Sequence, residues 1–380
     1  MKIFGVYMIT LSQLYSIVVL LTPVITCFAI VLILGIDCWH SSQNEWQVKS
    51  KALLYFTCAL VNWSSLLFYF FYPAIFVYIN WFVFLTFMLV QVYCYGFLFK
   101  ITRIDSNEHF SKYHYLLPLF FSLILLGVSL ITPFEGQLQI IKARGVCTNE
   151  AYRLFFLVSN SKILIRCGFG AVYVVLAFYR LHRYRKFIVN YSGNEEKTRL
   201  GWLIVYLYLA LGLTPLPILA LLYGDRSFVI SSSIMGGYNF VFIFQSVYLC
   251  YFILKNKYLV LPDEEPVAIA VDEDSNALKK NLLDRESFEQ YMLEKKPYLN
   301  SDLKITDLIE DLGVNRTYIS TFINTEYQMN FCSYINRCRL DEYIQLKKDV
   351  AYKGRSLKEL AELAGFGSYK SLLRIQDKEV

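Results

Sequence analysis

The sequence has few charged residues. Asp, Glu, Lys and Arg make up 18% of its 380 residues, whereas 56% are hydrophobic and 17% are aromatic. The mean hydropathy of +0.40 is too high for an ordinary soluble protein. The shortage of charge is confined to residues 1–257, because dense charge begins only after them. We therefore predict a membrane part followed by a soluble part.

The sequence also lacks the patterns of a metal site, a disulfide framework or a common enzyme. Its nine cysteines form no CxxC pair, and its four histidines lack the spacing of metal ligands. It contains no GxSxG, Walker A, HExxH or glycine-rich kinase-type motif. We expect no enzymatic activity, no catalytic residue, no metal and no cofactor. A cleavable signal pattern is absent as well, because Lys2 precedes a stretch long enough to remain as a span.

Residues 1–257 contain seven apolar stretches, and an apolar helix needs about twenty residues to cross a bilayer. We therefore predict an N-terminal seven-helix transmembrane bundle. The boundary at Tyr72 and Pro73 is the weakest, so six spans is the alternative. The stretches are Leu14 to Ile36, Ala52 to Phe71, Ala74 to Phe99, Tyr115 to Ile131, Leu154 to Tyr179, Leu200 to Leu222, and Phe228 to Leu254.

The distribution of Lys and Arg predicts the orientation of these spans. Basic residues in the loops after the first, third and fifth stretches, and after the seventh, outnumber those in the other loops. This bias predicts a protein of the cell inner (cytoplasmic) membrane with its N-terminus outside and its C-terminus in the cytoplasm. The longest expected outer loop runs only from Thr132 to Arg153, which excludes a folded outer sensor domain. An external signal would be read by the bundle or by a protein partner.

Two charged residues lie inside the fifth stretch, where charge is costly. Lys162 and Arg166 are four residues apart and share one helix face. In a structural interpretation, Lys162 extends to the outer surface and Arg166 hydrogen-bonds a neighbouring helix. In a functional one, they form a cationic pocket for an anionic ligand. We expect the other polar residues of the spans to form interhelical hydrogen bonds and not to line a transport path. They are Asn62, Asn80, Gln91, Asn239 and Gln245.

Residues 258–284 have the composition of a solvated linker. They are acidic, contain Pro262 and Pro266, and lack an apolar period. Residues 285–380 then form the soluble domain, which begins with a short amphipathic helix from Glu286 to Leu299. Lys and Arg are about as numerous as Asp and Glu in this domain. Any contact with DNA must therefore come from a local surface.

One helix-turn pattern occurs twice in the soluble domain. Apolar residues at i, i+3, i+4 and i+7, followed by a helix-ending glycine, recur at a fixed interval. Two consecutive units of this kind, each of two helices joined by a turn, are typical of a DNA-binding protein. The first copy is Ile305, Leu308, Ile309, Leu312 and Gly313, and the second is Leu357, Leu360, Ala361, Ala364 and Gly365.

Each copy is followed by a helix with one apolar and one polar face. Asn315 is a good N-cap for the first of these helices, and Ser356 with Glu359 forms a capping box in the second unit. A helical region from Phe331 to about Asp349 joins the two units. The expected buried residues are Ile319, Phe322 and Ile323 in the first helix, and Leu372 and Ile375 in the second.

The stretch KPYLNSDLKITDLIEDLGVNRTYISTFINTEYQMNFCSYINRCRL, followed by SLKELAELAGFGSYKSLLR, resembles the AraC/XylS-type DNA-binding domain in the form found in Bacteroidetes-like regulators. The resemblance covers about residues 295 to 378. It implies an all-α domain whose two helix-turn-helix units, joined by a long helix, enter successive major grooves of double-stranded DNA. By position, the implied DNA-binding residues are Arg316, Thr317, Ser320, Thr321 and Asn324 in the first unit, and Tyr369, Lys370, Ser371 and Arg374 in the second.

The sequence departs from this family at its end. Gln376 stands where the family has a buried Phe, and the closing helix of the family does not follow. A natural truncation, a frame change and a degenerate second unit are the alternatives. We expect the second unit to be looser by several kcal/mol if its usual core is lost. The first unit would then dominate binding.

These features predict a membrane-anchored transcription regulator of all-α structure. A lipid, small-molecule or protein signal would change the bundle and thereby bias the orientation or dimerisation of the DNA-binding domain. The expected partners are double-stranded DNA, membrane lipid and a second copy of the chain. The alternative is a multi-pass transporter or receptor whose degenerate helix-turn-helix tail serves protein interaction.

Overall fold

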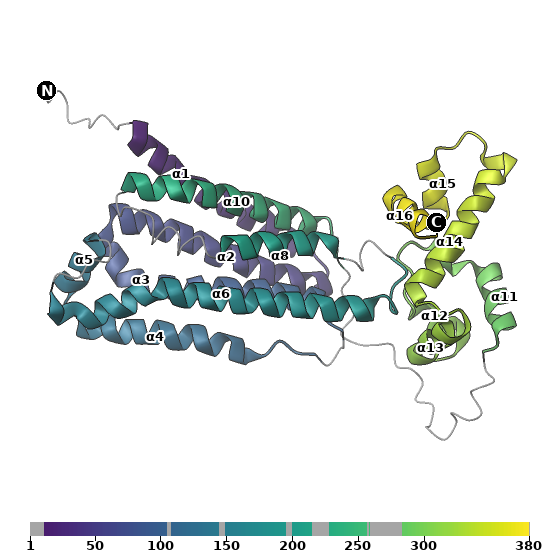
Figure 1. Ribbon diagram of the computed structural model, residues 1–380, viewed down its shortest axis with the longest axis horizontal. Helices are drawn as coiled ribbons and strands as arrows, with labels where there is room; N and C mark the ends of the chain where they lie inside the picture. Colours follow the sequence, from purple (N-terminus) through teal and green to yellow (C-terminus); the bar gives the residue numbers. More distant parts are fainter. Residues whose placement is uncertain are drawn as a thin grey trace, which may run out of the picture. The chain divides into compact units, whose positions relative to one another are not determined.

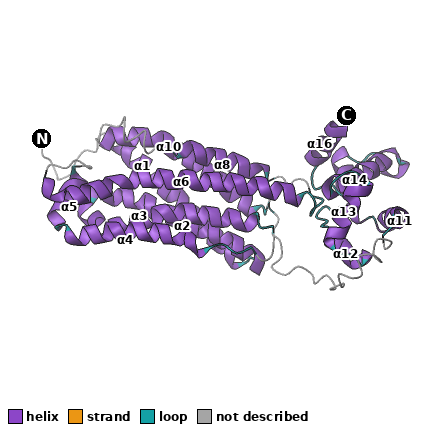
Figure 2. Ribbon diagram, turned by 60° about the horizontal axis from the view of Figure 1, so that its bottom comes forward, coloured by secondary structure: helices purple, strands orange, loops and turns teal. Residues whose placement is uncertain are grey.

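The chain is all-helical. In the computed structural model the described residues form helices and loops, with no strand among them (Figure 2). An antiparallel bridge joins Ser192 to Lys304. The chain divides into two compact units, unit 1 and unit 2. The described residues are 11–104, 108–143, 149–194, 200–214, 228–256, 258 and 283–379.

Unit 1 is a bundle of long apolar helices (Figure 1). Within this unit α2 packs against α3, α1 packs against α2, and α1 packs against α10. Residues of α6 up to Arg180 belong to this unit. The helices are α1 (Leu11–Trp39), α2 (Gln43–Phe71), α3 (Pro73–Ile101), η1 (Lys112–Tyr115), α4 (Leu116–Ile131), α5 (Phe134–Lys142), η2 (Glu150–Tyr152), α6 (Arg153–Ile188), α8 (Gly201–Leu213) and α10 (Phe228–Leu254).

Six described helices are long and apolar enough to cross a bilayer. They correspond to the first five expected spans and to the seventh. The expected boundary at Tyr72 and Pro73 is confirmed, because α2 ends at Phe71 and α3 begins at Pro73. Proline suits the first position of a helix, where a backbone N–H would have no partner within the helix. Of the sixth expected span, 200–222, the structure describes the short apolar helix α8, and 215–222 lie outside the described residues.

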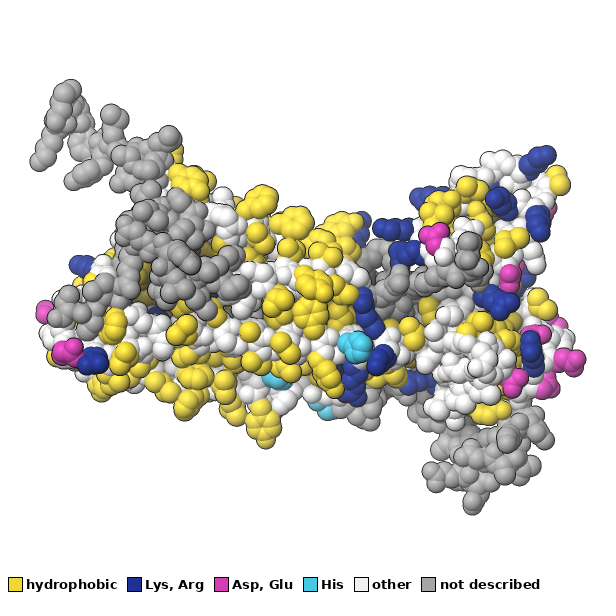
Figure 3. Space-filling model, viewed as in Figure 1, with side chains coloured by type: hydrophobic (Ala, Val, Ile, Leu, Met, Phe, Trp, Pro, Cys, Tyr) yellow, Lys and Arg dark blue, Asp and Glu magenta, His cyan; other side chains and the backbone are white. Residues whose placement is uncertain are grey.

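Many hydrophobic side chains lie on the face of unit 1 that Figure 3 shows. Leu130, Val175 and Phe240 are 78%, 65% and 75% exposed. A water-soluble protein rarely exposes so large a contiguous apolar surface, whereas lipid tails would cover it without cost. This surface is compatible with a multi-pass membrane protein.

Polar residues inside unit 1 join neighbouring helices. The Asn62 Oδ1 atom accepts a hydrogen bond from the Thr86 hydroxyl at 3.0 Å and thereby links α2 to α3. Asn239 Nδ2 donates to the Val19 carbonyl, which links α10 to α1. Gln245 makes a similar bond from α10 to the backbone of α8. The expectation of interhelical hydrogen bonds is confirmed for these three polar residues.

Unit 2 contains two helix pairs, α12 with α13 and α15 with α16. The long helix α14 lies between them in the chain and contacts α13, α15 and α16 (Figure 1). The expected connecting helix is thus confirmed. The elements are α11 (Arg285–Lys295), η5 (Pro297–Leu299), α12 (Asp307–Leu312), α13 (Arg316–Glu326), α14 (Phe331–Lys348), η6 (Val350–Tyr352), α15 (Leu357–Leu363) and α16 (Tyr369–Glu379).

Local caps set the ends of these helices. Gly313 ends α12 in the left-handed region, at a φ of +65°, and Asn315 Oδ1 accepts the Tyr318 amide at 2.8 Å to begin α13. The turn between α15 and α16 contains Gly365 at a φ of +87°. A Cβ atom at Gly365 would overlap the Tyr298 carbonyl oxygen, so only glycine fits there.

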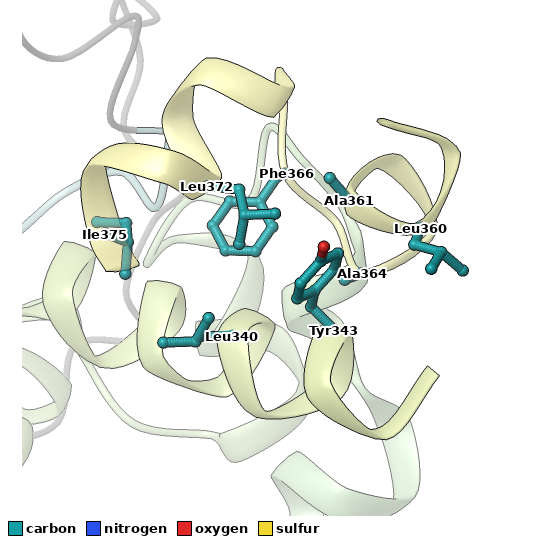
Figure 4. Packing of buried hydrophobic residues seen from close by; sticks show 8 residues of the cluster. All are labelled: Leu340, Tyr343, Leu360, Ala361, Ala364, Phe366, Leu372 and Ile375. Carbon is teal, nitrogen blue, oxygen red and sulfur yellow. The ribbon is translucent and has the colours of Figure 1, made fainter. Parts of the chain in front are cut away.

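The second helix pair shares a buried hydrophobic core with α14 (Figure 4). Leu372 is fully buried and Ile375 is 8% exposed, which confirms both as core residues. Gln376 lies half-buried beside them rather than inside the core. The core consists of Leu340, Tyr343, Leu360, Ala361, Ala364, Phe366, Leu372 and Ile375.

Two short segments that precede the expected linker cluster with unit 2. They are Arg103–Glu108 and Leu181–Gly201. The helix α6 continues beyond the expected span end at Tyr179 and ends only at Ile188. Of the expected linker 258–284, residues 259–282 lie outside the described residues.

Candidate nucleic-acid interface

The helix α13 is fixed in unit 2 by its apolar face. Ile319 and Ile323 are fully buried. Phe322 is half-buried, and its ring lies 5.3 Å from the ring of Phe288 in α11, in an edge-on contact. The predicted burial is therefore confirmed for Ile319 and Ile323, whereas Phe322 is buried only in part. The packing of this apolar face directs the polar side chains of α13 to the other side of the helix.

Four of the five polar residues predicted on α13 line one cleft. Thr317 and Thr321 are exposed, whereas Arg316 and Ser320 are half-buried. All four border a cleft of about 440 Å³. Asn324 is half-buried and is not among the residues that line it.

The opposite wall of this cleft comes from the end of α6 and from the residues around it. Arg183, Lys186 and Phe187 lie in the last turns of α6, and Asn190 follows them. Ile104 completes the lining. All of these residues belong to unit 2, so the cleft lies within one unit. This wall is not among the predictions from the sequence, although basic residues continue past Tyr179 and could have indicated it.

Arg316 points at the end of α6. Its guanidinium carbon lies 4.9 Å from the centre of the Phe187 ring and 5.8 Å from that of Tyr191. These are cation–π distances. One of the residues predicted to bind DNA is therefore engaged by the segment that forms the other wall.

Backbone hydrogen bonds hold the segment after α6 against unit 2. The Tyr191 carbonyl accepts the Ile305 amide at 2.9 Å, and the Gly193 amide donates to the Leu303 carbonyl at 2.9 Å. The Val189 carbonyl accepts a hydrogen bond from the first turn of α14, also at 2.9 Å. Buried backbone groups need such partners. This pairing is the physical reason why residues 181–201 cluster with unit 2.

Arg339 reinforces the same attachment from α14. Its side chain is 1% exposed. Nε and Nη2 donate to the Tyr298 and Asn300 carbonyls at 2.7 Å each, and Nη1 donates to the Gly193 carbonyl. Burial lowers the pKa of Arg339 to about 10, which still leaves it protonated at neutral pH. The sequence interpretation gave Arg339 no role.

No family model, curated protein or solved structure matches this chain. Its function must be inferred from the geometry and chemistry of its own residues.

In α16, the second helix predicted to contact DNA, fewer of the predicted residues are exposed to solvent. Lys370 is exposed, and Tyr369 and Arg374 are half-buried. Ser371 was expected to face outward, but it is 5% exposed and its hydroxyl donates to the Ser368 carbonyl at 2.6 Å. That outward placement is wrong, because the Ser371 side chain is used at the start of α16. Tyr369 also packs against the hydrophobic core.

The two charged residues of α6 contact other helices of unit 1. Lys162 Nζ donates to Asn80 Oδ1 in α3 at 2.6 Å. Arg166 Nη2 donates to the Tyr238 hydroxyl at 3.4 Å, and its guanidinium carbon lies 4.1 Å from the centre of the Phe87 ring. Arg166 thus makes the interhelical contact that the structural interpretation predicted.

Proposed function

We propose that the chain is a membrane-anchored transcription regulator of the AraC/XylS type, whose two helix pairs are helix-turn-helix units. The observation that carries the proposal is the repeated geometry of unit 2. In each pair a short helix, of 6 residues in α12 and 7 in α15, is followed by an 11-residue helix. A left-handed glycine lies in each turn. Two such pairs packed on one long helix suit adjacent major grooves.

The side chains of α13 suit contact with DNA. Arg316 can read guanine by two parallel hydrogen bonds, and Asn324 can read adenine in the same way. The hydroxyls of Thr317, Ser320 and Thr321 suit phosphate or base-edge contacts. On α16 the corresponding surface is smaller and rests on Lys370, Arg374 and the partly buried Tyr369. Ser371 would act only by positioning α16.

The membrane part would anchor the regulator and receive its signal. The apolar helices of unit 1 and the excess of basic residues in alternate loops support an inner-membrane protein whose unit 2 is cytoplasmic. A lipid, a small molecule or a protein partner is the proposed signal. A homodimer would let two copies bind two half-sites.

A DNA-binding test needs the full chain. A fragment that begins at residue 281 would lack residues 181–201, which belong to unit 2. Without them the amide of Ile305 and the guanidinium of Arg339 would lose partners. Loss of binding in that fragment would therefore not test the proposal, because misfolding alone would produce it.

The test uses the full chain in nanodiscs of neutral lipid. Duplexes are selected from a random-sequence pool, and their affinity is measured by fluorescence anisotropy over a range of salt concentrations. We expect the logarithm of the affinity to fall with the logarithm of salt, by about 0.9 for each phosphate contacted. Arg316→Ala should cost about 1 to 3 kcal/mol and relax specificity at one position.

Arg337→Ala is the matched control, because Arg337 is an exposed arginine of α14 outside the cleft. It should leave specificity unchanged. If the folded full chain selects no duplex and shows no salt-dependent binding, the regulator proposal is rejected. The protein-interaction alternative would then be favoured.

A further inference from the structure

The cleft between α13 and the end of α6 carries positive charge. Arg183 and Lys186 come from α6, and Arg316 comes from α13. No carboxylate occurs among the described residues that line it. Glu108 lies outside the lining, 3.8 Å from Arg183, whose side chain is 60% exposed. An ion pair this exposed is weak and leaves the Arg183 charge available.

Hydrogen-bond donors of α13 face the same space. Thr317, Ser320 and Thr321 add three hydroxyls to the three cations. Arg316 and Thr317 are also the first two residues of α13, so the positive end of the helix dipole lies at the cleft. Phosphate groups are bound by this combination of cations, hydroxyls and a helix N-terminus.

Two further features suit a nucleotide better than a bare phosphate. The Asn190 Oδ1 atom is buried and has no hydrogen-bond donor among the described residues. An exocyclic amino group of a base could supply one. The ring of Phe187 provides an aromatic surface in the lining, and the volume of about 440 Å³ is in the range of small-molecule sites.

The cleft cannot hold DNA in its present form. A helix in the major groove is flanked on both sides by phosphate backbone. The end of α6 occupies that position, since Phe187 lies only 4.9 Å from the Arg316 guanidinium carbon. A ligand bridging the two walls would hold them together, whereas DNA would require them to part.

We propose that this cleft binds a phosphorylated small molecule of the nucleotide class and that its binding competes with DNA for α13. The second half of the proposal rests on the proposed function, and the first half does not. The ligand phosphate would contact Arg183, Lys186 and Arg316, and the base would lie near Phe187 and Asn190.

The binding test uses the full chain in phosphatidylcholine nanodiscs with ADP, pyrophosphate and adenosine as probes in equilibrium dialysis. ADP and pyrophosphate should bind and adenosine should not. The double variant Arg183→Gln with Lys186→Gln should lose about tenfold or more in ADP affinity. The control, Lys347→Gln with Lys348→Gln, removes the same charge from exposed positions of α14 and should bind ADP normally.

Three results would overturn the binding proposal. One is the absence of ADP binding to the unaltered chain, and another is an equal loss in both double variants, which would indicate nonspecific charge attraction. The third is loss of ADP binding in phosphatidylglycerol nanodiscs, which would assign the site to a lipid headgroup phosphate.

A measurement of DNA binding in the presence of ADP tests this proposal separately from the proposed function. ADP should weaken duplex binding by the unaltered chain but much less so in the Arg183→Gln, Lys186→Gln variant. If ADP binds but leaves duplex affinity unchanged, competition is refuted. If no duplex binds to any variant, the proposed function fails, while ADP binding still tests the site.

Discussion

At the scale of single residues, Arg339 shows how hydrogen bonds stabilise a buried charge. Its guanidinium lies in the interior of unit 2, where an unpaired charge would cost several kcal/mol. Backbone carbonyls of Tyr298, Asn300 and Gly193 accept hydrogen bonds from it. The planar, five-donor fork of arginine matches three separate carbonyls in a way that the ammonium of lysine does not.

Replacement of Arg339 should therefore destabilise unit 2. We expect Arg339→Met to lower its free energy of unfolding by about 3 to 5 kcal/mol, because three backbone carbonyls, two of them in buried residues, lose their donor. Arg339→Lys should recover only part of this loss. The measurement is pulse proteolysis of the full chain in urea, with the cleaved fragments of unit 2 identified by mass.

Arg337 provides the control on the same helix. Its side chain is exposed, so Arg337→Met should change the stability by less than about 0.5 kcal/mol. Equal effects of Arg337→Met and Arg339→Met would show that the buried hydrogen bonds contribute nothing beyond charge.

At the scale of elements, the second helix pair depends on apolar packing against α14. Leu372 is fully buried among the core residues, whereas its neighbour Leu373 is 41% exposed. The described part of α16 is thus held by one apolar face (Figure 4). Loss of that face should release α16 while leaving the first pair in place.

Leu372→Ala should destabilise the second pair by about 2 to 5 kcal/mol through the cavity it leaves. Leu373→Ala is the matched control and should cost much less. Hydrogen exchange of the full chain would show faster exchange in α15 and α16 only for Leu372→Ala. Uniform acceleration across unit 2 would contradict the independence of the two pairs.

At the scale of the whole molecule, α6 belongs to both units. It is one continuous helix, and its residues cluster with unit 1 up to Arg180 and with unit 2 from Leu181. The same helix contributes Lys162 to the interior of unit 1 and Arg183 to the cleft. Residues of this one helix therefore contribute both to the packing of unit 1 and to the cleft of unit 2.

The proposed orientation predicts the outcome of reporter fusions in cells. Alkaline phosphatase fused after Ala143 should be active, because that loop is proposed to lie outside. The same enzyme fused after Lys295 should be inactive, while a fluorescent protein at that position should fold and fluoresce. Active phosphatase after Lys295 would place unit 2 away from the chromosome and reject the regulator.

The sequence by itself determined the features that depend on neighbouring residues. Long apolar runs specified the helices of unit 1, and the glycine and Asn315 between α12 and α13 specified that turn. The apolar spacing of α13 and α16 located Ile319, Ile323, Leu372 and Ile375 in the core. These are local patterns of hydrophobicity and capping, which a chain expresses wherever it is packed.

Only the tertiary structure decided what depends on residues far apart in the chain. Arg339 and Gly193 are 146 positions apart, yet their hydrogen bond helps attach the end of α6 to unit 2. The same attachment turns Arg316 toward Phe187 and forms the cleft. No local period encodes such a contact, because it follows from how buried polar groups find partners once the helices have packed.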